Sequence, residues 1–64
     1  MAVINGEKKC LQDTSLLEYL DSQKYDINRI AIEVNGLIIK RDSYGDYIIN
    51  ESDEVEIVCF VGGG

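Results

Sequence analysis

The sequence predicts a two-layer α+β domain, with one mixed β-sheet of about five strands and a single main helix covering one face. Two Asn-Gly dipeptides each lie between apolar runs, and a stripe of leucines lies between the two dipeptides. A run of alternating apolar and acidic residues lies near the end of the sequence. A helix with a single apolar stripe can cover one face of one sheet. At 64 residues, the whole of 1–64 is expected to form one small domain.

The Asn5-Gly6 and Asn35-Gly36 dipeptides predict two β-hairpins. A two-residue hairpin turn requires positive φ at its central residues, which Asn and Gly tolerate best. Asn-Gly between apolar runs is therefore a strong hairpin signal. The expected strands cover residues 2–4, 7–10, 30–34 and 37–40.

One helix is expected between the hairpins, beginning after cap residues 13–15 and ending near residue 23 or 24. Ser15 and Glu18 have the spacing of a capping box, in which the two residues bond each other's backbone amide groups. The stripe expected to face the sheet consists of Leu16, Leu17 and Leu20.

The residues after the second hairpin predict a polar connection, a turn and a last strand. Residues 41–47 should form a turn or a short 3₁₀ piece, in which Tyr44 and Tyr47 pack their rings and keep their hydroxyls in water. An acidic turn at 50–54 then leads into a strand from Val55 to Phe60. We expect this strand to fill the centre of the sheet, between the hairpins and parallel to the first strand.

Three glycines, Gly62, Gly63 and Gly64, follow this strand. Glycine has no Cβ and loses the most freedom on ordering, so a terminal run of it is expected to be a flexible tail. Such a tail would carry a free carboxylate at Gly64 on a tether that enters a channel too narrow for bulkier residues. The alternative is an inert frayed end or an expression scar.

The composition disfavours several classes of function. The net charge is −6, with 12 acidic and 6 basic residues, which argues against nucleic acid and anionic membranes as partners and suits docking onto a basic surface. The sequence has no histidine, the commonest general base and metal ligand, and a chain of this size has little room for an enclosed catalytic pocket. We therefore expect a non-enzyme. Neither a signal peptide nor an apolar span is recognisable, so a cytoplasmic location is expected.

The cysteines and acidic residues carry no metal or disulfide pattern. Cys10 and Cys59 are too few for a disulfide framework or a zinc site, and we expect two reduced, largely buried thiols. Cys59 alternates with Val55 and Ile57 and should therefore face the core; a redox role is the less favoured alternative. We expect the following acidic side chains to form a solvated surface rather than a metal site: Asp42, Asp46, Asp53 and Glu54.

Val58 and Phe60 alternate with Glu56 on the opposite face of the last strand. If the helix covers the other side of the sheet, these two apolar side chains are exposed beside the glycine tail. An exposed apolar patch in that position favours a docking surface for a partner protein. The alternative is that loops or the Tyr44–Tyr47 segment cover them.

The whole chain resembles the β-grasp, ubiquitin-like fold and, more narrowly, the ThiS family of sulfur carriers in thiamine biosynthesis. Each matching segment is weak alone, but together, at this length, they are specific. The segments are Val3-Ile4-Asn5-Gly6, Thr14-Ser15-Leu16-Leu17 with Leu20, Ile32-Glu33-Val34-Asn35-Gly36, Arg41 with Tyr44, and 53–64. Two positions depart from the family pattern: Lys40 stands where a proline often precedes the arginine, and Glu51-Ser52 replaces a common Asp-Gly.

The resemblance implies that the chain is a protein co-substrate without bound cofactor or metal. In such carriers a ThiF-type adenylyltransferase uses ATP and magnesium to adenylate the C-terminal carboxylate, here that of Gly64. Sulfur drawn from cysteine, through a desulfurase-type donor, then gives a thiocarboxylate, which the thiazole synthase ThiG uses. Gly63 completes the required glycine pair.

Two alternatives share the fold and the ending. One is the small subunit of molybdopterin synthase, although this chain is short and lacks that family's longer middle segment. The other is a ubiquitin-like modifier or interaction module that is joined to lysines through Gly64.

Overall fold

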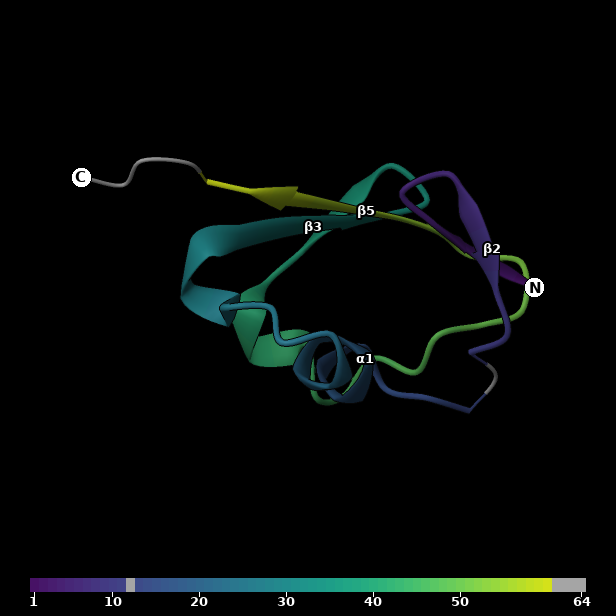
Figure 1. Cartoon of the computed structure of the whole chain (residues 1–64), viewed down its shortest axis with the longest axis horizontal. Coiled ribbons are helices and arrows are strands. Elements are labelled where there is room, and N and C mark those ends of the chain that lie inside the picture. The colour runs from purple at the N-terminus through teal and green to yellow at the C-terminus, as the bar shows by residue number, and fades with distance from the viewer. Residues whose placement is uncertain (12, 61–64) are drawn as a thin grey trace.

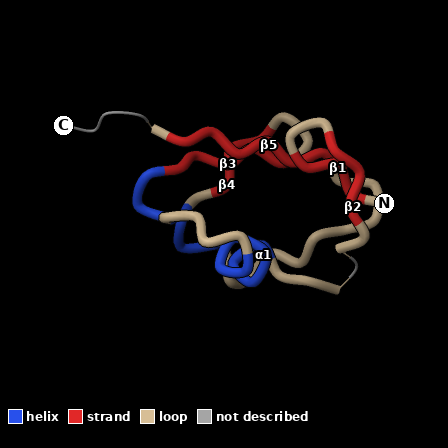
Figure 2. Tube along the Cα trace, viewed as in Figure 1, coloured by secondary structure: helices blue, strands red, loops and turns tan. Residues whose placement is uncertain are grey.

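The computed structural model describes residues 1–11 and 13–60. One α-helix lies against one face of a twisted sheet, and in the described part of the chain no helix covers the opposite face (Figures 1 and 2). The elements in chain order are β1 (Ala2–Ile4), β2 (Glu7–Lys9), α1 (Leu16–Ser22), the 3₁₀ helix η1 (Ile27–Arg29), β3 (Ile30–Val34), β4 (Leu37–Ile39), the 3₁₀ helix η2 (Arg41–Ser43) and β5 (Glu54–Cys59). The two-layer prediction is confirmed.

The sheet has the order β2-β1-β5-β3-β4, so the last strand lies at its centre. β5 runs parallel to β1, with Ile4 opposite Val55, and antiparallel to β3, with Ile32 opposite Ile57. The prediction that the last strand fills the gap between two hairpins is therefore confirmed.

Both predicted Asn-Gly turns form. Asn5 and Asn35 have φ of 49° and 52°, and the glycines after them have φ of 85° and 84°. The two asparagine side chains also reach β5. Asn5 accepts a hydrogen bond from the Ile57 amide at 2.7 Å, and Asn35 accepts one from the Glu54 amide at 2.9 Å. Each turn residue thus shapes its own hairpin and holds the central strand.

Helix α1 begins at the predicted cap. The Glu18 amide donates to Ser15 Oγ at 3.1 Å, and the Ser15 amide donates to Glu18 Oε1 at 3.2 Å, which completes the capping box. Leu16 and Leu20 are fully buried as predicted, but Leu17 is 39% exposed and Tyr19 is buried in its place. Positions 16, 17 and 20 span the same arc of a helix as positions 16, 19 and 20, so periodicity alone does not separate the two sets. The helix is rotated so that its Tyr19 side faces the sheet and its Leu17 side does not.

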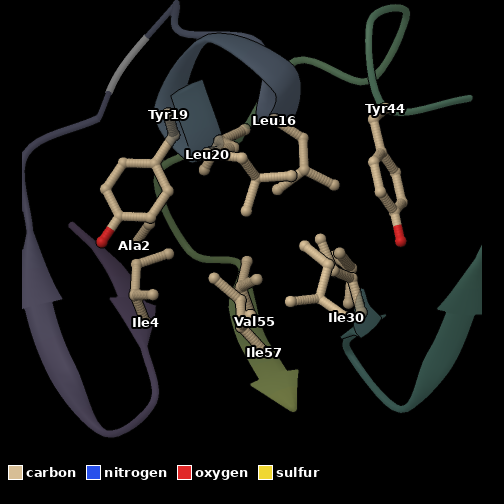
Figure 3. Packing of buried hydrophobic residues seen from close by; sticks show 12 residues of the cluster. Ala2, Ile4, Leu16, Tyr19, Leu20, Ile30, Tyr44, Val55 and Ile57 are labelled. Atoms are coloured by element: carbon tan, nitrogen blue, oxygen red, sulfur yellow. The ribbon is translucent and has the colours of Figure 1, made fainter. Parts of the chain in front are cut away.

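The core lies between α1 and the sheet (Figure 3). Tyr19, Leu16 and Leu20 from α1 point toward Ile4 of β1 and Val55 of β5. The other buried hydrophobic residues are Ala2, Ile30, Ile32, Val34, Tyr44, Ile49 and Ile57. Because residues 55 and 57 of the central strand belong to this core, β5 is anchored at its middle.

The start of β5 is anchored by a buried carboxylate, which the sequence did not predict. Asp53 is 4% exposed, so the expectation of a solvated side chain is wrong for it, whereas Asp42, Asp46 and Glu54 are exposed. Asp53 accepts hydrogen bonds from the Tyr47 hydroxyl at 2.6 Å, from the Asn50 amide at 2.9 Å and from Asn35 Nδ2 at 2.9 Å. The expectation that the Tyr47 hydroxyl stays in water is also wrong, because it binds Asp53.

Candidate functional site: the C-terminal end of β5

The pairing of β5 determines which of its side chains a partner can reach. Val55 and Ile57 point into the core, whereas Glu56, Val58 and Phe60 alternate with them and point to the opposite face of the sheet. Val58 is 52% exposed and Phe60 is 57% exposed. The predicted facing of Val58 and Phe60 is therefore confirmed, and within residues 1–11 and 13–60 no segment buries these two side chains. Their role in docking stays a prediction.

The expectation that Cys10 and Cys59 are buried is wrong, because both thiols are exposed. Cys59 does have the parity of Val55 and Ile57, and it lies opposite Ile30, the first residue of β3. Strand alternation fixes the face on which a side chain lies. It does not show whether the helical layer that covers this face extends to the end of the strand. At Cys59, as a result, both faces of β5 are accessible.

The face of the sheet opposite α1, which we call the open face, changes in character along β5. Near the start of the strand, Glu33, Glu54 and Glu56 surround a shallow hollow together with Gly36. Toward the end, Val58 lies beside Ala31 of β3, and Phe60 follows. The open face therefore presents an acidic region next to an apolar one, which fits a partner surface with basic and apolar groups.

Ile38 extends the apolar side chains of this face onto β4. It lies opposite Glu33 and is 76% exposed. Sequence reasoning missed Ile38. The signal that could have found it is its place in the strand expected after Asn35-Gly36, where it points to the same face as Lys40.

The Asp53 cluster fixes the strand from its other end. Burial alone would raise the pKa of Asp53, but the hydrogen bonds from Tyr47, Asn50 and Asn35 together outweigh it and lower the pKa below its ordinary value of 3.8. Burial, with the neighbouring Asp53 carboxylate, raises the pKa of Tyr47 to about 12. Tyr47 thus stays a proton donor and Asp53 an acceptor near neutral pH.

The predicted reacting group at Gly64, and the tether residues Gly62 and Gly63, lie outside the described residues. The last described contact before them is the Phe60 amide, which donates to the Arg29 carbonyl oxygen at 2.7 Å. The site that the structure describes is therefore the strand end from which these glycines follow.

Over residues 1–11 and 13–60, no group of three or more Cys, Asp or Glu side chains is placed to hold a metal ion. Within the same residues, no helix has both the length and the apolar character that crossing a membrane requires.

Comparison with known proteins places the chain in a family. Residues 2–64 match the model of the ThiS family. A thiazole synthase of Paramagnetospirillum magneticum is 36% identical over 63 residues, which cover 97% of this chain and 19% of that protein. The uncharacterized protein ycf40 of Porphyra purpurea is 39% identical over 62 residues, covering 95% of this chain and 87% of that one. The chain thus spans about a fifth of the thiazole synthase and most of ycf40.

A solved structure shares the fold. The crystal structure of the thiamine biosynthesis protein ThiS from Geobacter metallireducens superposes with a TM-score of 0.77 at 24% identity, covering 98% of this chain and 97% of that one. Its likeness confirms the β-grasp assignment of the five-stranded sheet and single helix. With the family model matched over residues 2–64, the chain belongs to the ThiS family.

Proposed function

We propose that this chain is a sulfur carrier in thiamine biosynthesis, and that the carboxylate of Gly64 is the group that carries the sulfur. The observation that supports this most is the family match, which runs over residues 2–64 and so includes the glycine ending. The proposed partners are a ThiF-type adenylyltransferase, a desulfurase-type sulfur donor and a thiazole synthase of the ThiG type, acting in the cytoplasm.

The proposed chemistry begins with activation by the partner. A carboxylate is a poor electrophile at neutral pH, so the ThiF-type enzyme transfers AMP from ATP, with magnesium, to the Gly64 carboxylate and releases pyrophosphate. A sulfur nucleophile derived from cysteine then displaces AMP and leaves a thiocarboxylate. The chain has no histidine and contributes recognition and a side-chain-free tether rather than an acid, a base or a metal.

The acceptor is proposed from the relatives. Proteins named thiazole synthase in Paramagnetospirillum magneticum and Magnetococcus marinus each contain a stretch similar to this chain, which covers 19% of their length. A carrier-like stretch in the same polypeptide as a protein of that name supports a thiazole synthase as the protein that receives the sulfur.

Docking is proposed through the open face at the end of β5. Val58 and Phe60 are exposed there, and the acidic residues next to them suit a basic partner surface. A well-packed apolar anchor at the centre of an interface contributes the most to affinity. Phe60 is the larger of the two and the closer to Gly64 in sequence.

The test of this function blocks the terminus. Removing Gly64, or replacing Gly63 with valine, should abolish or steeply lower pyrophosphate exchange by the ThiF-type enzyme, because a branched side chain stiffens the tether and does not fit a narrow channel. The melting temperature of each variant serves as the control for folding. Intact mass of the wild-type chain after reaction with ATP and a sulfur donor should show oxygen replaced by sulfur.

Two results would contradict the proposal. Undiminished exchange with the Gly64-deleted chain would exclude a requirement for the Gly64 carboxylate as the reacting group. Lysine-linked conjugates in place of a thiocarboxylate would identify a ubiquitin-like modifier instead.

A further inference from the structure

The backbone hydrogen bonds of β5 alternate between its two neighbours. Even-numbered residues bond toward β3: the Phe60 amide donates to Arg29 O at 2.7 Å, and Glu54 O accepts from the Asn35 amide at 2.8 Å. Odd-numbered residues bond toward β1. Val55 O accepts from the Asn5 amide at 2.9 Å. This alternation is the ordinary pattern of a strand with a partner on each side.

β1 is too short to accompany β5 to its end. β1 stops at Ile4, which lies opposite Val55. Two residues further along β5, at Ile57, the bonds on this side come from the side chain of Asn5 instead of from a strand backbone. Asn5 Oδ1 accepts from the Ile57 amide at 2.7 Å, and Asn5 Nδ2 donates to Ile57 O at 3.3 Å. The side chain thus replaces one residue of a strand. The N-terminal hairpin and the end of β5 lie toward opposite ends of the molecule (Figures 1 and 2).

Cys59 is the next residue whose backbone points toward β1. Its register opposite Ile30, between the bonded positions 58 and 60, turns its N–H and C=O away from β3. On that side β1 has ended, and no residue of 1–11 or 13–60 bonds these two groups. The end of β5 is therefore a sheet edge with an unpaired donor and acceptor, and such an edge is a template for pairing with another chain.

We propose that an extended segment of the activating enzyme adds to the sheet beside the end of β5, in the place that β1 leaves vacant. This inference rests on the proposed function, since it takes the ThiF-type enzyme as the occupant. The segment would bond the N–H and C=O of Cys59, as peptides do when they extend an exposed sheet edge. Strand addition would then fix the direction of the chain that leads to Gly64.

The surroundings of the edge define the chemistry of the added segment. Side chains of the segment on the open face would lie beside Val58 and Phe60, and the nearest charge on that face of β5 is Glu56. An apolar side chain followed by a basic one suits these neighbours. A second copy of this chain suits them poorly, because each copy carries a net charge of −6.

The distance from the Cys59 edge to Gly64 is short enough for one partner to bind both. Four residues follow Phe60, and a fully extended run of four residues spans at most about 14 Å. The enzyme that holds the Gly64 carboxylate at its nucleotide is thus within one short segment of the Cys59 edge.

The direct test is amide hydrogen exchange by NMR on the wild-type chain, free and bound to the ThiF-type enzyme. In the free chain the Cys59 amide should exchange rapidly, whereas the Phe60 amide, which donates to Arg29, should be protected. In the complex the Cys59 amide should become protected by at least about tenfold. A Cys59 amide that exchanges as fast in the complex as in the free chain would overturn the strand addition.

A pair of variants tests the same N–H by affinity. Proline is tolerated at sheet edges because the missing N–H faces outward there. Cys59→Pro should therefore bind the enzyme about tenfold more weakly than Cys59→Ala, which lacks the same thiol but keeps the N–H, a loss that corresponds to one backbone hydrogen bond. Equal affinities of the two folded variants would contradict the inference.

The two proposals fail in different ways. If the wild-type chain is adenylated while the Cys59 amide stays unprotected, only the strand addition is wrong. If the wild-type chain neither binds the enzyme nor supports pyrophosphate exchange, the proposed function is wrong and the inference fails with it.

Discussion

At the scale of single residues, Asp53 stands out because it is the one charged side chain that is buried among the residues that the structure describes. It is a buried carboxylate that forms no ion pair with any residue of 1–11 or 13–60, and it is stabilised by hydrogen bonds from Tyr47, Asn50 and Asn35. A buried acceptor with full hydrogen bonding favours folding, and the loss of a donor leaves a costly unpaired group. The cluster joins the Asn35 turn to the start of β5.

Asp53→Asn should lower the free energy of unfolding by about 1–3 kcal/mol near neutral pH, because an amide cannot accept from all three donors at once. The pKa of Asp53 is lowered in the folded chain, so its carboxylate stabilises the fold above the ordinary value of 3.8. That stabilisation is lost as the pH falls through the folded value. Urea denaturation across the range from about pH 7 to about pH 2.5 should thus show the wild type and variant converging.

Tyr47→Phe serves as the matched comparison, because it removes one donor and keeps the carboxylate. Its loss of stability should be smaller than that of Asp53→Asn. A difference between wild type and Asp53→Asn that stays constant with pH would show that the carboxylate does not carry the effect.

Asn5 provides a second prediction at this scale. Asn5→Gly keeps the positive φ that the turn requires but removes both side-chain hydrogen bonds to Ile57. The free energy of unfolding should fall by about 1–2 kcal/mol. The Ile57 amide should exchange faster with solvent than in the wild type, while amides paired with β3 change less. Unchanged exchange at Ile57 would mean that the Asn5 side chain does not hold the strand.

These residues also mark the limit of sequence reasoning. The turn role of Asn5 and Asn35 could be predicted, since it depends on neighbouring residues. Their bonds to β5 could not, because Asn5 and Ile57 are 52 positions apart and meet only through the topology of the sheet. Asp53 was misjudged for the same reason, since an acidic residue in a polar turn is ordinarily solvated and only tertiary contacts show otherwise.

At the scale of elements, β5 combines a buried middle with an exposed end. Periodicity alone predicted the facing of Val58 and Phe60, because alternation along a strand is strict. The same periodicity failed for Cys59, since alternation does not report where the covering helix stops. The prediction for Leu17 is wrong for a related reason, since the spacing of apolar residues does not report how the helix is rotated relative to the sheet.

The variant Phe60→Ala tests whether the exposed end of β5 contributes to binding rather than to stability. Because the ring is 57% exposed, the loss of stability should stay below about 1 kcal/mol, whereas truncation of a core residue such as Ile57 should cost about 2–5 kcal/mol. Binding to the ThiF-type enzyme should weaken by about 1–3 kcal/mol if Phe60 is a central anchor. Denaturation and binding are measured on the same preparations.

The matched control is Leu37→Ala, which removes another exposed apolar side chain, 71% exposed, near the start of β5 rather than its end. It should affect binding less than Phe60→Ala. A large loss of stability in Phe60→Ala would instead mean that the ring belongs to the core.

At the scale of the whole molecule, the architecture was predictable because local signals agreed with each other. Two Asn-Gly turns, one capped helix and one terminal strand leave few ways to form a sheet. The order β2-β1-β5-β3-β4 follows once the last strand pairs with the first strand of each hairpin, β1 and β3. What the sequence did not reveal was the unpaired edge at Cys59, because it depends on β1 ending before β5 does.

The net charge of −6 gives a prediction for the whole molecule. If the acidic region of the open face meets a basic partner, the association rate with the ThiF-type enzyme should fall as salt rises. The double variant Glu33→Gln/Glu56→Gln should associate more slowly at low salt and show a weaker salt dependence. Rates are measured by stopped-flow mixing.

The control double variant, Asp21→Asn/Glu51→Gln, changes the net charge equally but lies on the helix and on a turn. It should change the rate less. Equal effects of the two double variants would mean that overall charge, rather than this region, guides association.

The central place of β5, between a parallel β1 and an antiparallel β3, has a mechanical consequence. A partner that draws in the terminus pulls along the axis of β5. Force in that direction slides the strand against both neighbours and loads their hydrogen bonds in shear, many at once. An outermost strand pulled sideways would unzip one bond after another. The strand order therefore lets a partner pull on the proposed reactive end while the rest of the domain keeps its shape.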